Sequence, residues 1–346
     1  MKELINSIRI FLIYRFYNIG VILERISNKG FALDIFSSSF QNNPYKTYSR
    51  MRSINPIYHS KPTFLRWVTK MDLVQEMIRD DRFSVDDRKF PIAKLRRNEL
   101  RRDGRDIMLD QFENPSILKL DPPDHSRIRK LVSYGFTNRY IKSLETEIND
   151  TINQCLDKTH NLESFDLMNV LAKPLPAIVI AKMMGLPDSD LNQFQTWSEN
   201  LLKEVGGIGS SVKKRKLARD AYEDLIRYFE KIIIERKDNP GDDFIGKLIL
   251  AEEEGDKLNV KEMYGTCLLL LIAGHETTTR LVGNGLFALL NHPDQFECLK
   301  DDHSKIPNAI EEMLRYEPPV HATVRFANEN MTYRNRDYKR GTPFAI

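Results

Sequence analysis

Apolar residues recur every three or four positions along most of the chain, which is the spacing of one face of an α-helix. The pattern stops at Pro187, Gly206-Gly207 and Asn239-Pro240-Gly241, because proline and glycine end helices. Residues 56–58, 63–69 and 320–346 have the composition of short strands and turns. The expected fold class is mainly α with a small β-sheet. Helices are predicted over residues 72–79, 126–134, 138–157, 165–184, 188–203, 211–237, 242–254, 259–290, 294–301 and 306–316.

Between residues 83 and 118 the chain has no clear period and is rich in basic residues, so an irregular segment is predicted there. The basic part, residues 89–105, is either an ordinary solvated loop or a surface that binds an acidic substrate or an acidic acyl-carrier protein. Its basic residues are Lys89, Lys94, Arg96, Arg97, Arg101, Arg102 and Arg105.

The N-terminal residues 8–23 are mostly apolar, but Arg9, Arg15 and Asn18 interrupt them. A membrane-spanning helix needs about 20 apolar residues with few or no charges. A signal peptide needs an unbroken apolar stretch and a small-residue cleavage site, and neither is evident. Residues 1–40 are therefore predicted to be an N-terminal helical extension. It either packs on the body of the protein or lies on a membrane surface as a weakly bound amphipathic helix.

The net charge and the cysteine content limit which classes of partner and which cellular compartment are expected. The 346 residues carry 52 Lys and Arg against 49 Asp and Glu, and a net charge of +3 gives no argument for nucleic acid. The three cysteines, Cys155, Cys267 and Cys298, are far apart and show no C-x-x-C spacing. Such thiols fit a reducing compartment, so a cytoplasmic protein is expected.

The longest predicted helix begins at Asn259, whose side chain can cap it with Glu262 as the reciprocal partner three residues on. It ends near Leu290, before Asn291-His292-Pro293. About 30 residues at 1.5 Å each span about 45 Å, enough to cross a whole domain. Because residues 268–273 are apolar on all sides, the centre of this helix is predicted to be buried.

Polar residues interrupt that apolar centre at Glu276 and Thr277. A buried acid and a buried hydroxyl are costly unless they are hydrogen-bonded. Thr277 can donate to the carbonyl of Ala273, four residues earlier. Gly274 allows another group to approach the helix closely. The pattern predicts a small polar notch in an apolar wall.

A zinc site is a competing interpretation of the pair His275-Glu276. A zinc protease helix carries H-E-x-x-H, with two histidines four positions apart on one face. Here the second histidine position is Thr279, and no other histidine cluster replaces it. The sequence therefore predicts no metal ligands of this kind.

Three further motifs accompany the notch. Glu312 and Arg315 are three positions apart on one helix face, a pairing that is usually a surface feature. The proline-rich start of a helix at residues 121–124 precedes His125 and Arg129, which share a face. Arg325 lies in a short strand-like stretch. Each of these alone is compatible with ordinary surface residues.

Together the four motifs resemble those of the cytochrome P-450 family, in order and in spacing. Residues 273–279 (Ala-Gly-His-Glu-Thr-Thr-Thr) resemble its oxygen-activating helix. Residues 311–319 (Glu-Glu-Met-Leu-Arg-Tyr-Glu-Pro-Pro) resemble its Glu-x-x-Arg helix. Residues 121–129 and 319–327 resemble its haem-flanking segments. The resemblance covers roughly residues 44–346 and implies a P-450-like fold and a bound haem b.

The resemblance also implies roles for individual residues. Glu276 would be the acid that relays protons toward dioxygen, and Thr277 the hydroxyl that holds the oxygen intermediate. Ala273 and Gly274 would form the wall beside the haem. The propionates would be bound by His125, Arg129 and Arg325. Glu312 and Arg315 would form a buried structural lock behind the haem.

The axial ligand is the departure from the family's pattern. The family binds iron through a cysteine thiolate on a glycine-rich turn downstream of these motifs. No cysteine follows Cys298, and Cys267 and Cys298 lie in predicted helices. The expectation is a P-450-like domain over residues 41–346, truncated before the Cys loop and the final helix.

The function implied by the resemblance is that of a soluble, bacterial-type haem-dependent monooxygenase. It would hydroxylate or epoxidise an apolar small molecule with dioxygen and with electrons from a ferredoxin or flavodoxin-type donor. Because the axial Cys is absent, two alternatives stay open: a non-catalytic remnant, or one part of a split enzyme. A basic cluster would steer an acidic donor, and its members are Arg127, Lys130, Arg139 and Lys142.

Overall fold

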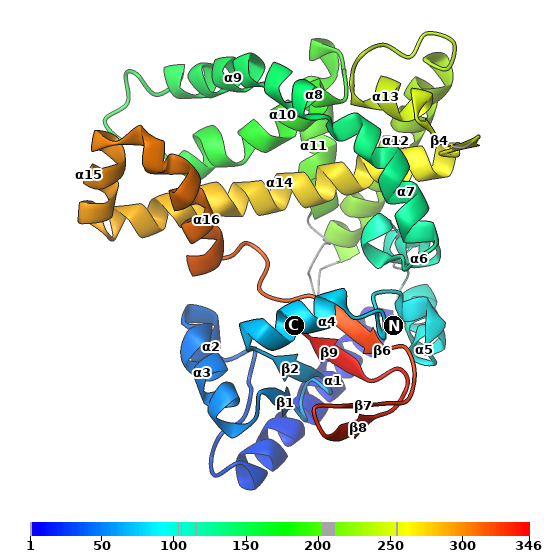
Figure 1. Cartoon of the computed structure of the whole chain (residues 1–346), viewed down its shortest axis with the longest axis vertical. Coiled ribbons are helices and arrows are strands. Elements are labelled where there is room, and N and C mark those ends of the chain that lie inside the picture. Colours follow the sequence, from blue (N-terminus) through cyan, green and yellow to red (C-terminus); the bar gives the residue numbers. More distant parts are fainter. Residues whose placement is uncertain (1, 103, 105, 115, 203–211, 254) are drawn as a thin grey trace. The chain divides into compact units, whose positions relative to one another are not determined.

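The computed structural model describes residues 2–102, 104, 106–114, 116–202, 212–253 and 255–346. The fold is mainly helical with small sheets (Figure 1). It divides into two compact units. The sheet unit comprises residues 1–96 and 322–346, and the helical unit comprises residues 97–321. The boundary falls within helix α5 (Ile92–Arg102).

The sheet unit is built around five short strands in the order β1-β2-β9-β6-β3. Strands β2 and β9 are parallel, and the other neighbours are antiparallel. The strands are β1 (Ile57–His59), β2 (Arg66–Val68), β3 (Phe83–Ser84), β6 (Val324–Ala327) and β9 (Pro343–Ala345), with a separate hairpin of β7 (Met331–Tyr333) and β8 (Arg336–Tyr338). The helices are α1 (Lys2–Ser27), α2 (Ser38–Asn42), α3 (Pro44–Ile54) and α4 (Met71–Arg79), with a helical turn η1 (Asp87–Lys89).

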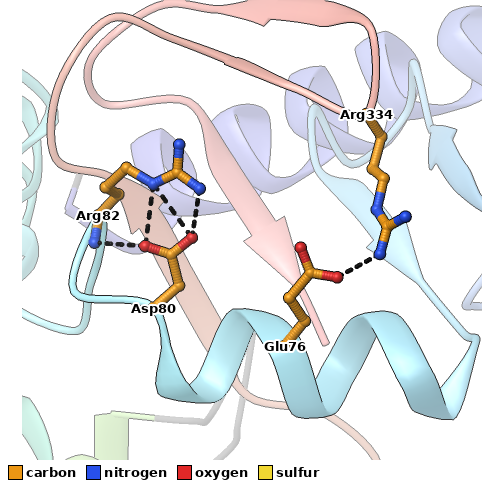
Figure 2. Close-up of polar contacts among 4 residues, drawn as sticks. All are labelled: Glu76, Asp80, Arg82 and Arg334. Carbon is orange, nitrogen blue, oxygen red and sulfur yellow. Dashed lines mark hydrogen bonds and ion pairs between the residues drawn. The ribbon is translucent and has the colours of Figure 1, made fainter.

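Helix α4 and the sheet share one apolar core, in which Leu73 and Met77 of the helix pack with Phe83 and Phe344 of the strands. Two arginine–carboxylate pairs lie near the helix (Figure 2). Arg334, in the β7–β8 turn, donates to the carboxylate of Glu76. Its φ of 50° and that of Asn335, 60°, are those that a two-residue hairpin turn favours.

The second pair in Figure 2 lies just past the end of α4. The Nη2 group of Arg82 donates to Oδ2 of Asp80 at 2.6 Å, and its Nε donates to Oδ1 at 3.0 Å. Because the arginines of both pairs are largely exposed, we expect these pairs to orient the loops around α4 more than to stabilise the unit.

Helix α1 is fastened to the sheet unit by a fully buried carboxylate, Glu24. Its Oε1 accepts hydrogen bonds from the hydroxyl of Tyr58 and from the N–H of Leu33, the latter at 2.9 Å. Its Oε2 accepts from the N–H of Lys61 at 2.5 Å. The C-terminal part of α1 is thus packed on the body of the unit, beside β1 (Figure 1). None of the helices in the described residues is both long and apolar enough to cross a membrane.

The helical unit is layered around its longest helix, α14 (Val260–Leu290), which crosses the unit in Figure 1. Helices α10, α11 and α12 pack against it. The remaining helices are α6 (Asp106–Glu113), α7 (Asp124–Ser133), α8 (Asn138–Ser143), α9 (Glu145–Asp157), α10 (Pro174–Met183), α11 (Leu191–Leu202), α12 (Val212–Glu235), α13 (Phe244–Leu250), α15 (Pro293–Asp301) and α16 (Ile306–Tyr316). A two-stranded hairpin, β4 (Glu252–Glu253) and β5 (Asp256–Lys257), precedes α14. Single helical turns are η2 (Ile117–Lys119), η3 (Tyr134–Phe136), η4 (Met168–Ala172), η5 (Asp188–Asp190) and η6 (His303–Lys305).

The start of α14 has the predicted capping box. Oδ1 of Asn259 accepts from the N–H of Glu262 at 3.0 Å, and Oε2 of Glu262 accepts from the N–H of Asn259 at 2.9 Å. The other oxygen of Glu262, Oε1, accepts from the guanidinium of Arg127 on α7. Arg127 also contacts Asp256 at 3.4 Å. One carboxylate therefore serves both the cap and an ion pair to a second helix.

Arg236 joins the ends of three helices in the helical unit. Its Nη1 donates to Oδ2 of Asp243 at 2.6 Å, and its Nη2 donates to the carbonyl of Gly185 at 2.6 Å. Oδ1 of Asp243 caps α13 by accepting from the N–H of Gly246 at 3.0 Å. Gly185 itself ends α10 with a φ of 70°. The three ends are held together by one guanidinium and one carboxylate.

Many of the elements expected from the sequence are confirmed. Strands β1 and β2, helices α4, α15 and α16, and the strands of the tail lie where the patterns predict them. Helix α7 begins at Asp124, after the predicted proline stop, and α14 has the predicted extent. Of the helices predicted over 188–203 and 211–237, residues 203 and 211 lie outside the described residues. The turn η5 and helix α11 cover residues 188–202, and α12 covers residues 212–235.

The prediction of an irregular segment over residues 83–118 is wrong. The segment contains β3, α5 and α6. The apolar period is hidden by many arginines, but Ala93, Leu100 and Phe112 are buried. Two of the charges that suggested a solvated loop are paired: Nη1 of Arg96 contacts Asp87 at 3.0 Å, and Nε of Arg97 contacts Glu113 at 2.5 Å.

Three predicted helices are shorter than expected or are divided. The segment 138–157 breaks at Leu144, which ends α8 and precedes α9. The segment 165–184 becomes a wide helical turn followed by α10, because Pro174 cannot continue a helix from the preceding turn. The segment 242–254 is helical only to Leu250, and the chain then forms the β4–β5 hairpin.

Candidate active site

The residues of the predicted polar notch lie in the middle of α14. The hydroxyl of Thr277 donates to the carbonyl of Ala273 at 2.5 Å, as the four-residue spacing predicts. At 100° per residue, Ala273, Glu276 and Thr277 lie on one side of the helix. Because the proton of Thr277 is directed at Ala273, the lone pairs of its oxygen remain available to accept a hydrogen bond.

Glu276 has a partner that the sequence analysis missed. Nη2 of Arg280, one turn further on, donates to Oε1 of Glu276 at 2.6 Å. About a third of the Glu276 side chain, 32%, is exposed. An acid four positions ahead of an arginine is a favourable helical pair, and this spacing was the available signal. The carboxylate is therefore oriented by Arg280 and remains partly exposed to solvent.

Gly274 allows close packing on another side of the helix. A Cβ at this position would lie 2.9 Å from Cδ1 of Ile180 on α10. The group that approaches α14 at Gly274 is therefore an apolar side chain of the protein. In the described structure this glycine brings α10 and α14 together, and its proposed place beside a cofactor remains a prediction.

His275 and Thr279 lie on the side of α14 opposite Ala273 and Thr277. Nδ1 of His275 is 2.5 Å from the hydroxyl of Ser198 on α11, and both side chains are buried. Burial lowers the pKa of His275, so the ring is neutral near neutral pH. The buried hydroxyl of Thr279 has no hydrogen-bond partner within the described chain. Nothing in the sequence pointed to Ser198, which is 77 positions from His275.

The described residues contain no cluster of side chains that could bind a metal ion. No group of three or more His, Cys, Asp or Glu residues there is placed to hold a metal ion. His275 contacts Ser198 rather than a second metal-binding side chain.

His125 and Arg129, two of the residues expected at the propionates, lie on α7 in the helical unit. His125 is half-buried and Arg129 is exposed. In the described part of the chain, neither side chain has a hydrogen-bond partner. Two nitrogen donors one helical turn apart can bind a carboxylate together.

Arg325, the third expected propionate residue, lies on β6 in the sheet unit. Its Nη1 donates to the carbonyl of Val324 at 3.2 Å and to the hydroxyl of Thr323 at 3.4 Å. The three residues thus belong to two different units.

Glu312 and Arg315 form the expected pair on α16. Nε and Nη2 of Arg315 donate to the two oxygens of Glu312 at 2.6 and 2.5 Å. These bonds hold the pKa of Glu312 below its ordinary value. The expectation of burial differs from the structure, in which the side chains are 64% and 58% exposed. The inner face of α16 is formed by Met313, whose sulfur packs against Gly285 of α14, and this leaves the pair outside.

The cysteines do not provide an axial ligand for haem. Cys155 and Cys267 are buried in α9 and α14, and burial raises the pKa of Cys267 to about 12. Cys298 is half-buried in α15, with Nζ of Lys305 3.0 Å from its sulfur. Paired nitrogen donors such as those of α7 suit a haem propionate. These three cysteines do not fit the position of a thiolate ligand to haem iron.

A family model described as "Cytochrome P450" matches residues 92–346. The chain belongs to the cytochrome P450 family, which makes it a monooxygenase by family resemblance and implies a haem iron, a small-molecule substrate and a redox partner. The family, the mainly α fold and the class of enzyme predicted from the sequence are confirmed.

Individual relatives cover most of the chain. The polyketide biosynthesis cytochrome P450 PksS of Bacillus subtilis strain 168 is 35% identical over 309 residues, 87% of this chain and 74% of that protein. The chain is also similar to CYP109E1 from Bacillus megaterium, whose crystal structure contains testosterone. The two chains share 32% sequence identity and superpose with a TM-score of 0.75, over 88% of this chain and 75% of that chain. P450BioI in complex with a hexadec-9Z-enoic acid ligated acyl carrier protein is 31% identical with a TM-score of 0.75, over 89% and 77% of the two chains.

Proposed function

We propose that this protein hydroxylates or epoxidises an apolar small molecule, using dioxygen, haem b and electrons from a ferredoxin or flavodoxin-type donor in the cytoplasm. The observation that carries the proposal is the notch on α14, where Thr277 is bonded to Ala273 and Glu276 lies on the same side. Apolar ligands in related proteins support the substrate class, since CYP109E1 binds testosterone. Haem b is favoured over covalently attached haem because the cysteines form no C-x-x-C-H motif.

Each residue of the notch has a separate task in this proposal. Haem, when bound, supplies the activation of dioxygen, which no side chain of the protein can perform. Glu276, held by Arg280 and in contact with water, moves protons from solvent into the notch. The oxygen of Thr277 accepts a hydrogen bond there and so holds a polar group against an otherwise apolar wall. His125 and Arg129, one helical turn apart on α7, would bind a propionate together.

The test is incorporation of one oxygen atom into an apolar compound. The full chain is supplied with haem, a surrogate ferredoxin with its reductase, and a steroid or a fatty acid under ¹⁸O₂. The expected product carries one ¹⁸O by mass spectrometry. A chain that binds haem but forms product only with a second, Cys-containing polypeptide would support the split-enzyme alternative. A chain that binds no haem would support the non-catalytic remnant.

Replacing Thr277 with alanine should lower product formation about 10- to 100-fold, because it removes the oxygen that accepts a hydrogen bond in the notch, and such a bond to a charged group contributes about 1.5–3 kcal/mol. Glu276→Gln should have an effect of similar size, because an amide cannot exchange the proton. Haem content, measured by absorbance, should stay unchanged in both variants. Thr278→Ala is the matched control, since Thr278 is exposed on the same helix. Equal activity of the Thr277 and Thr278 variants would remove the proposed role.

We assign the binding of the electron donor to only part of the predicted basic cluster, namely its residues on α8. Arg127 is engaged by Glu262 and Asp256, whereas Arg139 and Lys142 of α8 are exposed. We expect the double variant Arg139→Glu, Lys142→Glu to slow electron transfer about 3- to 10-fold at low ionic strength, because the acidic donor would be repelled.

The control for this surface is Lys213→Glu, Lys216→Glu, which makes the same change of charge at exposed positions of α12. Stopped-flow reduction of the haem would be measured at several salt concentrations. The difference between the α8 variant and the unchanged protein should vanish at high salt. A rate that is equally slow in both double variants, or that ignores ionic strength, would contradict steering by α8.

A further inference from the structure

Helix α1 has two apolar sides, and only one of them is covered by the protein. Val21 and Glu24 face the sheet unit and are buried. Gly20 lies against Pro62, with a Cβ position 2.9 Å from the Cα of that proline. The hydroxyl of Tyr17 accepts from the N–H of Ile35 at 2.8 Å. These contacts fix which side of α1 faces the body of the unit and which side faces away.

The opposite side of α1 carries a stripe of large apolar side chains. At 100° per residue its members fall within a sector of about 120°, turned away from Val21 and Glu24. Their exposed fractions run from 45% to 76%, so none of them is covered. In the sequence, Ile5, Ile8 and Leu12 precede the series at the same spacing of three or four residues. The stripe consists of Phe16, Ile19, Ile22, Leu23 and Ile26.

A second exposed aromatic residue is held beside this stripe by the turn between β1 and β2. Nζ of Lys61 donates to the hydroxyl of Ser27 at 3.0 Å and lies 3.5 Å from the carbonyl of Leu23, which places the turn along the Leu23 edge of the stripe. Phe64 in that turn is 74% exposed and has a φ of 58°. A bulky residue in this region is strained. Because strained backbone is concentrated at sites that bind ligands or partners, the exposed ring of Phe64 is a candidate contact with something outside the chain.

The charge of this part of the chain indicates what that partner is. Residues 1–70 contain 11 Lys and Arg and 3 Asp and Glu, a net charge of +8, whereas the remaining residues contain 41 and 46, a net charge of −5. The acids described there, Glu24 and Asp34, are hydrogen-bonded to the protein. Two copies joined through α1 would bring these like charges together. An anionic surface would be attracted by them.

We propose that α1 lies on an anionic lipid bilayer, with the stripe and Phe64 at the boundary between headgroups and acyl chains. Arg15, Arg25, Lys29 and Lys61, all exposed, would contact lipid phosphates. The helix would lie parallel to the surface, since its opposite side is fixed to the sheet unit through Glu24. This docking depends on neither haem nor the proposed oxygenation.

The test is co-flotation of the full chain with vesicles of phosphatidylglycerol and phosphatidylcholine in equal parts. We expect binding at least about tenfold stronger than to phosphatidylcholine alone, and weaker in high salt. The triple variant Phe16→Ser, Ile19→Ser, Ile26→Ser should bind the mixed vesicles at least about tenfold more weakly. Its circular dichroism should be unchanged, because all three side chains are exposed.

The matched control is Met71→Ser, Ile78→Ser, Ile92→Ser, which removes equally exposed apolar side chains of the same unit and should bind like the unchanged chain. Sedimentation without vesicles tests the competing occupant of the stripe, which is a second copy of the chain. An unchanged chain that stays unbound to both kinds of vesicle overturns the proposal. So does a dimer that the stripe variant converts to a monomer while vesicle binding is absent, since the stripe would then join two copies.

Discussion

Gly185→Ala is expected to lower the free energy of unfolding by about 3–5 kcal/mol. The φ of 70° at this position costs an L-residue about 1–2 kcal/mol. In addition, the new Cβ would lie 2.0 Å from Oδ2 of Asp243, and overpacking of this kind typically costs about 1–3 kcal/mol. Movement of Asp243 would also weaken its bond to Arg236 and its cap on α13.

The control for Gly185 is Gly255→Ala in the β4–β5 hairpin. Gly255 has a similar φ of 82°, but no described atom lies within 4 Å of its Cβ position. Only the cost of a positive φ applies at Gly255, so the free energy of unfolding is expected to fall by about 1–2 kcal/mol. Urea unfolding followed by circular dichroism would measure both. Equal losses would show that Asp243 is not a steric constraint.

The second large effect is expected at Glu24. Glu24→Ala leaves the hydroxyl of Tyr58 and the N–H groups of Leu33 and Lys61 without their acceptor. A buried donor without a partner costs about 1–3 kcal/mol, so we expect a total loss of about 3–5 kcal/mol. Burial, together with the same carboxylate, raises the pKa of Tyr58, and this shift should become smaller in the variant.

Exposed Glu329 in the same unit provides the comparison, since Glu329→Ala should cost less than about 0.5 kcal/mol. Limited proteolysis after Ser27 should become faster in Glu24→Ala only, because α1 would be released from the sheet unit. Loss of stability equal to that of Glu329→Ala would mean that the buried carboxylate does not fasten α1.

The site could be predicted from sequence where a contact is local. The bond from Thr277 to Ala273 and the reciprocal cap of Asn259 and Glu262 each join residues three or four positions apart, and helical spacing alone determines them. The pair of Ser198 and His275 joins two helices 77 positions apart, and no local pattern encodes it.

The helices were predictable from the sequence where the apolar pattern along the chain was regular. Long apolar periods located α14, α15 and α16. Helix α5 was missed because basic residues occupy most of its surface, and their acids, Asp87 and Glu113, come from outside the helix. Exposure was also misjudged for Glu312, because the family pattern specifies the pair with Arg315 but not what covers it in this chain.

The two hydrogen-bonding tasks of Glu262 restrict which residue this position can hold. A capping box normally accepts Glu or Gln at its third residue. Here Oε2 closes the cap and Oε1 accepts from Arg127, so both atoms must be acceptors. Glutamine has one oxygen and one N–H₂ group, and it would either leave the cap open or turn two donors toward a guanidinium. Among homologues that keep an arginine at position 127, substitution to glutamine at position 262 should therefore be rare, whatever compound each enzyme oxidises.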